Sequence, residues 1–163
     1  MHVTTRESYV ATSADPRPDL PHEAARILVA ENDDDVRSLI VVVLERNGHS
    51  VDVALDGQHA WELAQQNRYD VLVLDVEMPR LSGIELIGQV RAHPTAGASR
   101  VLMLSGVTGR NAVLRARSEG ADEYLSKPFR LGELSERVRS LIAQGPVGQV
   151  DSASQAALPP VDS

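Results

Sequence analysis

Short apolar segments alternate with amphipathic segments through the middle of the chain. The apolar segments predict five β-strands, at residues 26–30, 49–54, 70–74, 101–104 and 123–125. The third strand is apolar on both faces, which is typical of the middle of a parallel sheet that helices cover on both sides.

A segment with helical periodicity follows each predicted strand. The first helix stops at Asn47-Gly48 and the second begins after Asp56-Gly57, while the third and fourth lie near 82–92 and 111–119. The apolar positions expected to face the core are Val36, Leu39, Ile40, Val43 and Leu44 in the first helix, Ala60, Leu63 and Ala64 in the second, and Leu131, Leu134, Val138, Leu141 and Ile142 in the last.

Five strand-helix units with short connections predict an α/β fold built on a doubly wound parallel sheet. Ligands of such sheets bind beyond the carboxyl ends of the strands, near the switch in strand order. The polar residues at or just after these ends are Glu31, Asn32, Asp75, Ser105 and Lys127. We therefore expect the chemistry at this edge.

The length of 163 residues fits one domain, because a domain usually has roughly 100 to 200 residues. We place this domain at residues 25–144. Residues 1–24 and 145–163 are rich in Pro, Ser, Asp, Ala and Gly, and such segments bury too little apolar surface to order themselves. Both are predicted to be disordered tails.

Composition and charge exclude several classes of protein. The net charge is −7, the acidic residues gather at 31–35 and the arginines are scattered, which argues against direct binding of nucleic acid. The chain has no cysteine, so disulfides, thiolate metal sites and cysteine nucleophiles are excluded. The longest apolar run, 39–44, is too short for a membrane span, and the first 25 residues lack a signal peptide. We expect a cytoplasmic protein.

Lys127 is the only lysine among sixteen basic residues. A compact ammonium on a flexible stem contacts phosphoryl oxygens as a point charge, which the planar guanidinium of arginine does with a different geometry. A chain that otherwise uses arginine has either kept this lysine by accident or kept it for a phosphate site.

Asp75 follows an apolar strand directly, so its carboxylate is expected to project into the loop. A carboxylate in this position can act as a nucleophile towards phosphorus. Glu31, Asn32 and a backbone carbonyl near Glu77 add oxygen ligands, and such a set suits Mg²⁺, which completes its octahedron with water and phosphate.

Ser105 supplies a hydroxyl, and Gly106 leaves room for a phosphoryl group beside the backbone. Lys127 supplies a positive charge. Loose phosphoryl-transfer transition states need positioning and charge neutralisation, and these groups provide both. Plainer roles compete with functional ones. Residues 33–35 are expected to form a helix N-terminus rather than a metal site, and Trp61 and Tyr124 are expected to be partly buried packing residues.

Four segments carry a resemblance to a known family. They are Ile27 to Arg37 with its acidic start, Leu74-Asp-Val-Glu-Met-Pro79 followed by Gly83, Met103-Leu-Ser-Gly106, and Gly120 to Phe129 with Tyr124 and Lys127. In this order and spacing, residues 26–143 resemble the receiver domain of bacterial two-component response regulators. The resemblance implies a flavodoxin-like sheet with strand order 2-1-3-4-5.

By this resemblance Asp75 is the phosphoacceptor, served by a sensor histidine kinase or phosphotransfer protein. Glu31 and Asn32 match the metal-binding acidic pair, Ser105 and Tyr124 the switch residues, and Lys127 the phosphate-contacting lysine. Asn32 departs from the family, which usually has an acid there, so weaker Mg²⁺ binding is expected. The effect of Glu77 on phosphate lifetime is left open.

The leading hypothesis is a stand-alone receiver that is not a turnover enzyme. It would signal through protein contacts of the face formed by the fourth helix, fifth strand and fifth helix. Arg110, Arg115 and Arg117 either serve a homodimer contact or form a solvated face. A phosphorylation-independent binding module is the second hypothesis, because of Asn32. A haloacid-dehalogenase-like phosphatase also uses Asp, Ser and Lys, but its nucleophile is on the first strand. A flavin protein is disfavoured by the 3% aromatic content and the acidic first loop.

Overall fold

The computed structural model describes residues 24–107 and 109–148. The two predicted tails, 1–24 and 145–163, lie largely outside this range. Within it, no helix is long and apolar enough to cross a membrane.

The described residues form one parallel sheet of five strands. The strands are β1 (Arg26–Ala30), β2 (Ser50–Ala54), β3 (Val71–Asp75), β4 (Arg100–Ser105) and β5 (Glu123–Ser126). Their order is β2-β1-β3-β4-β5, and all four pairings are parallel. The predicted doubly wound α/β fold and its strand order are confirmed.

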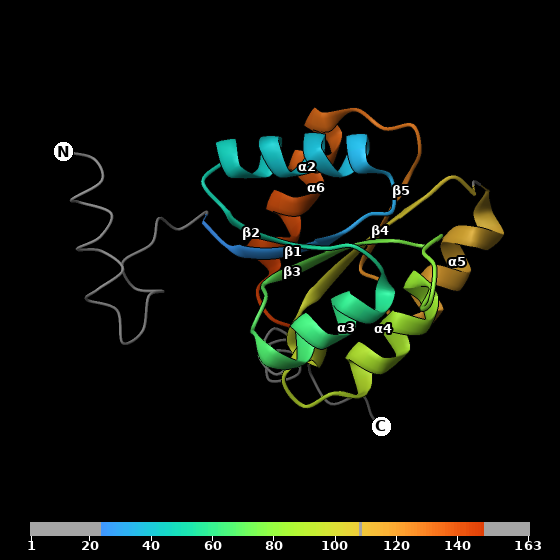
Figure 1. The fold of residues 1–163 in the computed structure, drawn as a ribbon. Coiled ribbons are helices and arrows are strands. Elements are labelled where there is room, and N and C mark those ends of the chain that lie inside the picture. The colour runs from blue at the N-terminus through green and yellow to red at the C-terminus, as the bar shows by residue number, and fades with distance from the viewer. Residues whose placement is uncertain (1–23, 108, 149–163) are drawn as a thin grey trace, which may run out of the picture.

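Helices cover both faces of the sheet. They are α2 (Asp34–Arg46), α3 (Gly57–Gln66), α4 (Gly83–Ala92), α5 (Arg110–Glu119) and α6 (Leu131–Gln144), with the short 3₁₀ helix η2 (Ala96–Ala98) before β4. Figure 1 shows α2 and α6 on one face and α3, α4 and α5 on the other. The short helix η2 was not predicted from the sequence, because three residues are too few to show a helical period.

The sheet separates two apolar clusters. On β3, Leu72 and Leu74 belong to the cluster under α3 and α4, while Val71 and Val73 belong to the cluster under α2 and α6. Successive side chains of a strand point to opposite faces, so this strand is buried on both sides. All five of its residues are buried, and the position of Asp75 is therefore fixed by the core.

The caps of α2 follow the sequence. Asp33 is the N-cap and accepts a hydrogen bond from the Val36 N–H at 3.0 Å, and Asn47 ends the helix as predicted. The predicted core face was wrong at Leu39, whose exposed fraction is 53%. Leu39 precedes the buried Ile40 by one residue, which turns it roughly 100° around the helix and away from the sheet.

The Arg91 side chain connects the two segments that lead into the amino ends of β4 and β5. The Arg91 guanidinium donates to the carbonyls of Gly97, Ser99 and Gly120 and to the Asp122 carboxylate, at 2.6 to 3.0 Å. Because one guanidinium on α4 satisfies three carbonyls from two connecting segments, it links α4, the η2 segment and the α5–β5 turn at a distance from the candidate site.

The residues after α6 are hydrogen-bonded at the same end of the sheet. Arg100 donates from Nε to the Gly145 carbonyl at 2.7 Å, and the Val147 N–H donates to the Ala98 carbonyl at 2.9 Å. These bonds link residues just beyond α6 to the segment that leads into β4.

Candidate functional site

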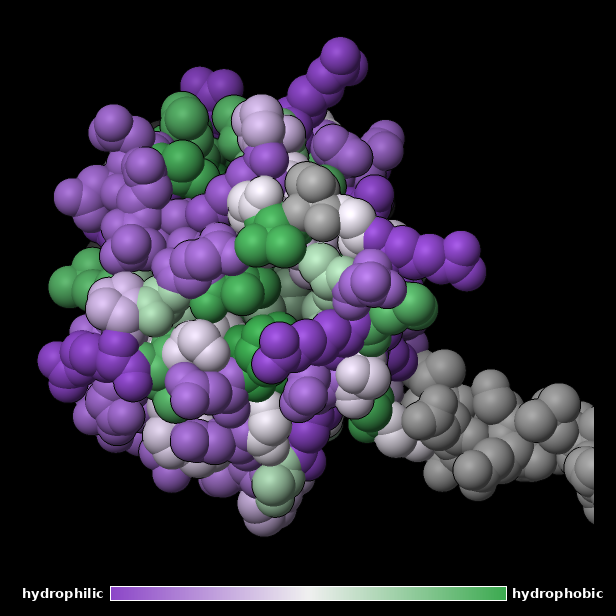
Figure 2. Space-filling view, turned by 90° about the vertical axis from the view of Figure 1, so that its right-hand side faces the viewer, coloured by the Kyte–Doolittle hydropathy of each residue, from purple (hydrophilic) through white to green (hydrophobic). Residues whose placement is uncertain are grey.

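Four of the predicted side chains meet at the carboxyl ends of the strands. Glu31 follows β1, Asp75 ends β3, Ser105 ends β4 and Lys127 follows β5. Figure 2 shows this side of the molecule, where hydrophilic residues lie around several hydrophobic ones. The convergence predicted from strand order is therefore present.

Asp75 is the centre of the group and is only 1% exposed. Its Oδ1 accepts the Glu77 N–H at 3.1 Å. Its Oδ2 lies 3.4 Å from the Asn32 N–H and 3.3 Å from Lys127 Nζ. Donors therefore face both oxygens of the carboxylate.

Lys127 neutralises two carboxylates at once. Its Nζ lies 3.0 Å from Glu31 Oε1 and 3.1 Å from Glu31 Oε2, in addition to the contact with Asp75. Burial lowers the pKa of Lys127, but the hydrogen bond to Glu31 and the charge of Asp75 outweigh it and raise the pKa above its usual value. The ammonium is therefore charged at neutral pH.

Glu31 is fully buried. Burial is the main reason why the pKa of its carboxyl is raised, and the negative charge of Asp75 adds to the effect. Oε2 accepts the Asp33 N–H at 2.9 Å, but Oε1 has no hydrogen bond within the described part of the chain, although Lys127 is close. The ion pair with Lys127 at 3.0 Å is therefore what compensates the burial of Oε1 among the described residues.

These oxygens fit a hard cation of modest affinity. Glu31 and Asp75 are acids, Asn32 is exposed and would add an uncharged amide, and the backbone carbonyl of Glu77 is nearby in sequence. Among the described residues no three His, Cys, Asp or Glu side chains group as a metal site. Two carboxylates with neutral oxygens still suit Mg²⁺, because this ion keeps several waters.

The Glu77 side chain contacts Ser105 and Gly106, which the sequence did not predict. Its Oε2 accepts the Ser105 hydroxyl at 2.8 Å, and its Oε1 lies 3.4 Å from the Gly106 N–H. The sequence prediction had used the backbone carbonyl of this residue as a metal ligand and had left open how its carboxylate affects phosphate lifetime, but it had not placed the carboxylate on Ser105. No local pattern identifies the contact, because Glu77 and Ser105 are 28 residues apart.

Ser105 and Tyr124 are connected through Val107. The Val107 N–H donates to Ser105 Oγ at 2.9 Å, and the Tyr124 hydroxyl donates to the Val107 carbonyl. Tyr124 is 8% exposed, so it is buried more deeply than the sequence predicted. The two residues share one hydrogen-bonded segment between β4 and α5.

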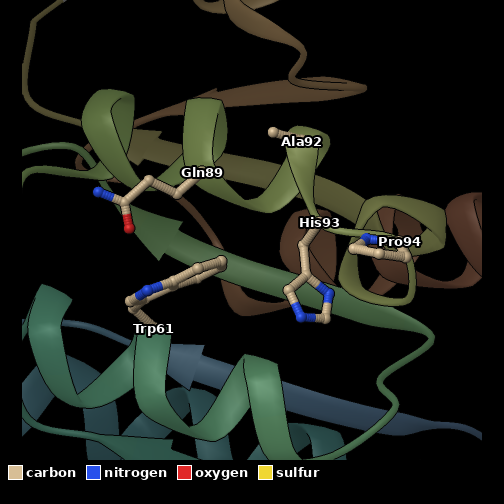
Figure 3. A pocket seen from close by; sticks show the side chains of 5 residues that line it. All are labelled: Trp61, Gln89, Ala92, His93 and Pro94. Carbon is tan, nitrogen blue, oxygen red and sulfur yellow. The ribbon is translucent and has the colours of Figure 1, made fainter.

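An open hollow of about 310 Å³ lies between α3 and α4. Trp61, Gln89, Ala92, His93 and Pro94 line it, and Figure 3 shows the Trp61 and His93 rings facing one another. The two rings are in an edge-to-face arrangement with centroids 5.7 Å apart. The residues after α4 lead to the amino end of β4, so this hollow is separate from the edge that holds Asp75.

Comparison with known proteins identifies related sequences. The family model of the response regulator receiver domain matches residues 27–139. Response regulator MprA of Mycobacterium sp. (strain KMS) is 42% identical over 117 residues, which is 72% of this chain and 50% of that protein. Transcriptional regulatory protein TcrA of Mycobacterium tuberculosis is 39% identical over 125 residues, or 75% of this chain and 47% of that protein. The chain spans about half the length of the curated relatives it matches.

Solved structures of similar fold include receiver domains. The receiver domain of Francisella response regulator 1452 has a TM-score of 0.70 and 35% identity, covering 74% of this chain and 98% of its own. The receiver domain of sensor histidine kinase PA1611 from Pseudomonas aeruginosa, solved with a magnesium ion in its active site cleft, has a TM-score of 0.68 and 25% identity. It covers 74% of this chain and 98% of its own.

Proposed function

Because the chain belongs to the receiver domain family of bacterial two-component response regulators, we propose that Asp75 is the residue that accepts the phosphoryl group. Receivers are signalling modules that interact with histidine kinases or phosphotransfer proteins, and the donor here is the phosphohistidine of such a partner. The observation that carries the proposal is the buried Asp75 carboxylate, which two backbone N–H groups and one ammonium face.

In this reaction a carboxylate oxygen of Asp75 attacks phosphorus while the P–N bond to the donor imidazole breaks. The electron pair of that bond returns to the imidazole nitrogen, which is then free to take a proton from solvent. Lys127, the Ser105 hydroxyl and the Gly106 N–H receive the phosphoryl oxygens. A Cβ at Gly106 would meet no atom within 4 Å, so the space for the phosphoryl group supports this assignment.

Members of this family typically bind Mg²⁺, and the donor set of this chain suits the ion. We assign its protein ligands to Glu31, Asn32, Asp75 and the backbone carbonyl of Glu77. The ion would offset the repulsion between the anionic acceptor and the anionic donor. Oε1 of Glu31 supports the assignment, because it is buried and has an ion pair with Lys127 but no hydrogen bond within the described residues. The uncharged amide of Asn32 predicts weaker binding than two acids would give.

The output passes through protein contacts in the cytoplasm. The bonds from Ser105 to Val107 and from Val107 to Tyr124 support a route by which a change at the acceptor reaches α5, β5 and α6. The partner is another protein or a second copy of this chain, and not nucleic acid or membrane. The exposed arginines Arg110, Arg115 and Arg117 are on α5, within this face.

The test is intact-mass spectrometry after incubation with acetyl phosphate, with and without Mg²⁺. We expect an adduct of one phosphoryl group on the wild type that is stable to acid, labile to base and dependent on Mg²⁺. Asp75→Asn should show none. Equal labelling of wild type and Asp75→Asn would refute the acceptor.

A phosphorylation-independent binding module is the second candidate, and Asn32 is the observation in its favour. It differs from the first candidate in having no use for the cation. Millimolar or tighter Mg²⁺ binding that Asp75→Ala abolishes would count against it, whereas a folded wild type that gains neither metal nor phosphoryl group from acetyl phosphate or a histidine kinase would support it.

A further inference from the structure

The Ser105 hydroxyl and the Gly106 N–H, the two neutral donors assigned to the phosphoryl group, are already hydrogen-bonded to the Glu77 carboxylate. Ser105 Oγ donates to Glu77 Oε2 at 2.8 Å, and the Gly106 N–H points to Glu77 Oε1 at 3.4 Å. Ser105 is fully buried, and Glu77 is exposed, so the carboxylate reaches inward from solvent to these groups. One carboxylate thus spans both donors.

The backbone of Glu77 is tied to the acceptor itself. Its N–H donates to Asp75 Oδ1 at 3.1 Å. The residue therefore lies with its main chain on Asp75 and its side chain on the donors next to Asp75. A phosphoryl group on Asp75 would bring a charge of about −2 to donors that a negative carboxylate already occupies.

We propose that the Glu77 carboxylate is an internal competitor for the phosphoryl-binding donors, which a phosphoryl group can use only after Glu77 has moved away. This proposal rests on the assignment of Asp75 as the acceptor. It concerns the occupancy of Ser105 and Gly106 before phosphorylation, and it makes Glu77 a positioning residue rather than a catalytic one.

The contact extends to Tyr124. The Ser105 oxygen that donates to Glu77 also accepts the Val107 N–H at 2.9 Å, and the Val107 carbonyl accepts the Tyr124 hydroxyl. Glu77 therefore holds the unphosphorylated chain in an arrangement in which Ser105 is bound to an anion and Tyr124 is buried. Removal of Glu77 frees the donors and loosens this segment.

Exposure makes the exchange feasible. Glu77 is followed by the turn that leads to α4, and its side chain can return to water, where a carboxylate is well solvated. A buried carboxylate in the same position would block the site permanently, whereas an exposed one opposes phosphorylation by the strength of its contacts only. The effect on affinity is therefore expected to be moderate.

The experiment measures binding of beryllium trifluoride, a phosphoryl mimic, to the full chain in the presence of Mg²⁺. Titrations are followed by the amide NMR signals of Gly106 and Val107. We expect Glu77→Ala to bind roughly tenfold more tightly than wild type, which corresponds to about 1.4 kcal/mol. Glu77→Gln keeps an acceptor for the Ser105 hydroxyl but lacks the charge, so its affinity should fall between the two.

The matched control is Glu62→Ala, which removes the same charge from an exposed position on α3 and should bind like wild type. A purely structural role for Glu77 would alter the urea midpoint without this order of affinities. Equal affinities of wild type and Glu77→Ala, or weaker binding by Glu77→Ala, overturn the proposal if Asp75→Asn abolishes binding. Absence of binding by every variant, or binding that survives Asp75→Asn, overturns the acceptor assignment and this proposal together.

Discussion

Replacing Lys127 by methionine tests how much the stability of the protein depends on the one ammonium that lies beside the Glu31 and Asp75 carboxylates. Lys127 Nζ lies 3.0 Å from Glu31 and 3.3 Å from Asp75, whose side chains are 0% and 2% exposed. Methionine keeps much of the stem volume but leaves two buried carboxylates facing each other without a counter-charge. We therefore expect a large loss of stability.

The size of this loss follows from burial. Removing one partner of a buried ion pair typically costs about 3 to 5 kcal/mol. The Lys127 side chain is 24% exposed, and Glu31 can relieve the repulsion by taking up a proton, so we expect about 3 kcal/mol at pH 7. The control is Arg80→Met, which removes a 66% exposed guanidinium 3.7 Å from Asp56, and which should cost less than about 1 kcal/mol.

Equilibrium unfolding in urea measures both variants. With a typical slope of about 2 kcal/mol per molar urea, a loss of 3 kcal/mol lowers the midpoint by about 1.5 M. Adding Glu31→Gln to Lys127→Met should recover part of the loss, because it removes one of the two charges. The reasoning is refuted if Lys127→Met is no less stable than Arg80→Met, or if the second substitution makes the protein still weaker.

Two further predictions concern residues away from the acceptor. Arg91→Met should lower the free energy of unfolding by about 3 kcal/mol. The hydrogen bonds of Arg91 are charge-assisted, and such bonds are worth about 1.5 to 3 kcal/mol each when they are counted separately. A urea midpoint equal to that of the exposed control Arg139→Met would contradict this. Burial first, and then the hydrogen bond to Asp52 at 2.6 Å, raise the pKa of the Tyr69 hydroxyl. The phenol of the unfolded chain ionises near pH 10. The stability that the folded state gains from the protonated Tyr69 is therefore fully present below about pH 10 and is lost as the pH rises further. Tyr69→Phe should therefore lose less stability between pH 9 and 11.5 than wild type, and parallel pH profiles would show that Tyr69 does not contribute.

The fold was predictable because its signals are local. Alternation of apolar strands and helical periods, the stop at Asn47-Gly48 and the cap at Asp33 all depend on residues within a few positions of one another. The error at Leu39 has a different origin: the sequence shows an apolar face, but only packing decides where its edge lies. The 3₁₀ helix η2 was missed since it is too short to have a pattern.

The site was predictable to the level of strand ends, but not to the level of contacts. Parallel strands bring Glu31, Asp75, Ser105 and Lys127 to one edge whatever their rotamers. The direction of a side chain in a loop depends on neighbours that are distant in sequence. Lys127 and Glu31 are 96 residues apart, and the capture of Ser105 by Glu77 depends on how two loops approach each other.

The hydrogen bonds of the residues beyond α6 determine where the chain leaves the domain. Val147 is bonded to Ala98 and Gly145 to Arg100, so the chain leaves the domain beside the start of β4. Asp75 lies at the far end of the neighbouring strand β3, and a five-residue strand is roughly 16 Å long. The last bonded residues after α6 therefore lie at the pole opposite the acceptor, and a protein bound to them would be separated from Asp75 by about the length of a strand.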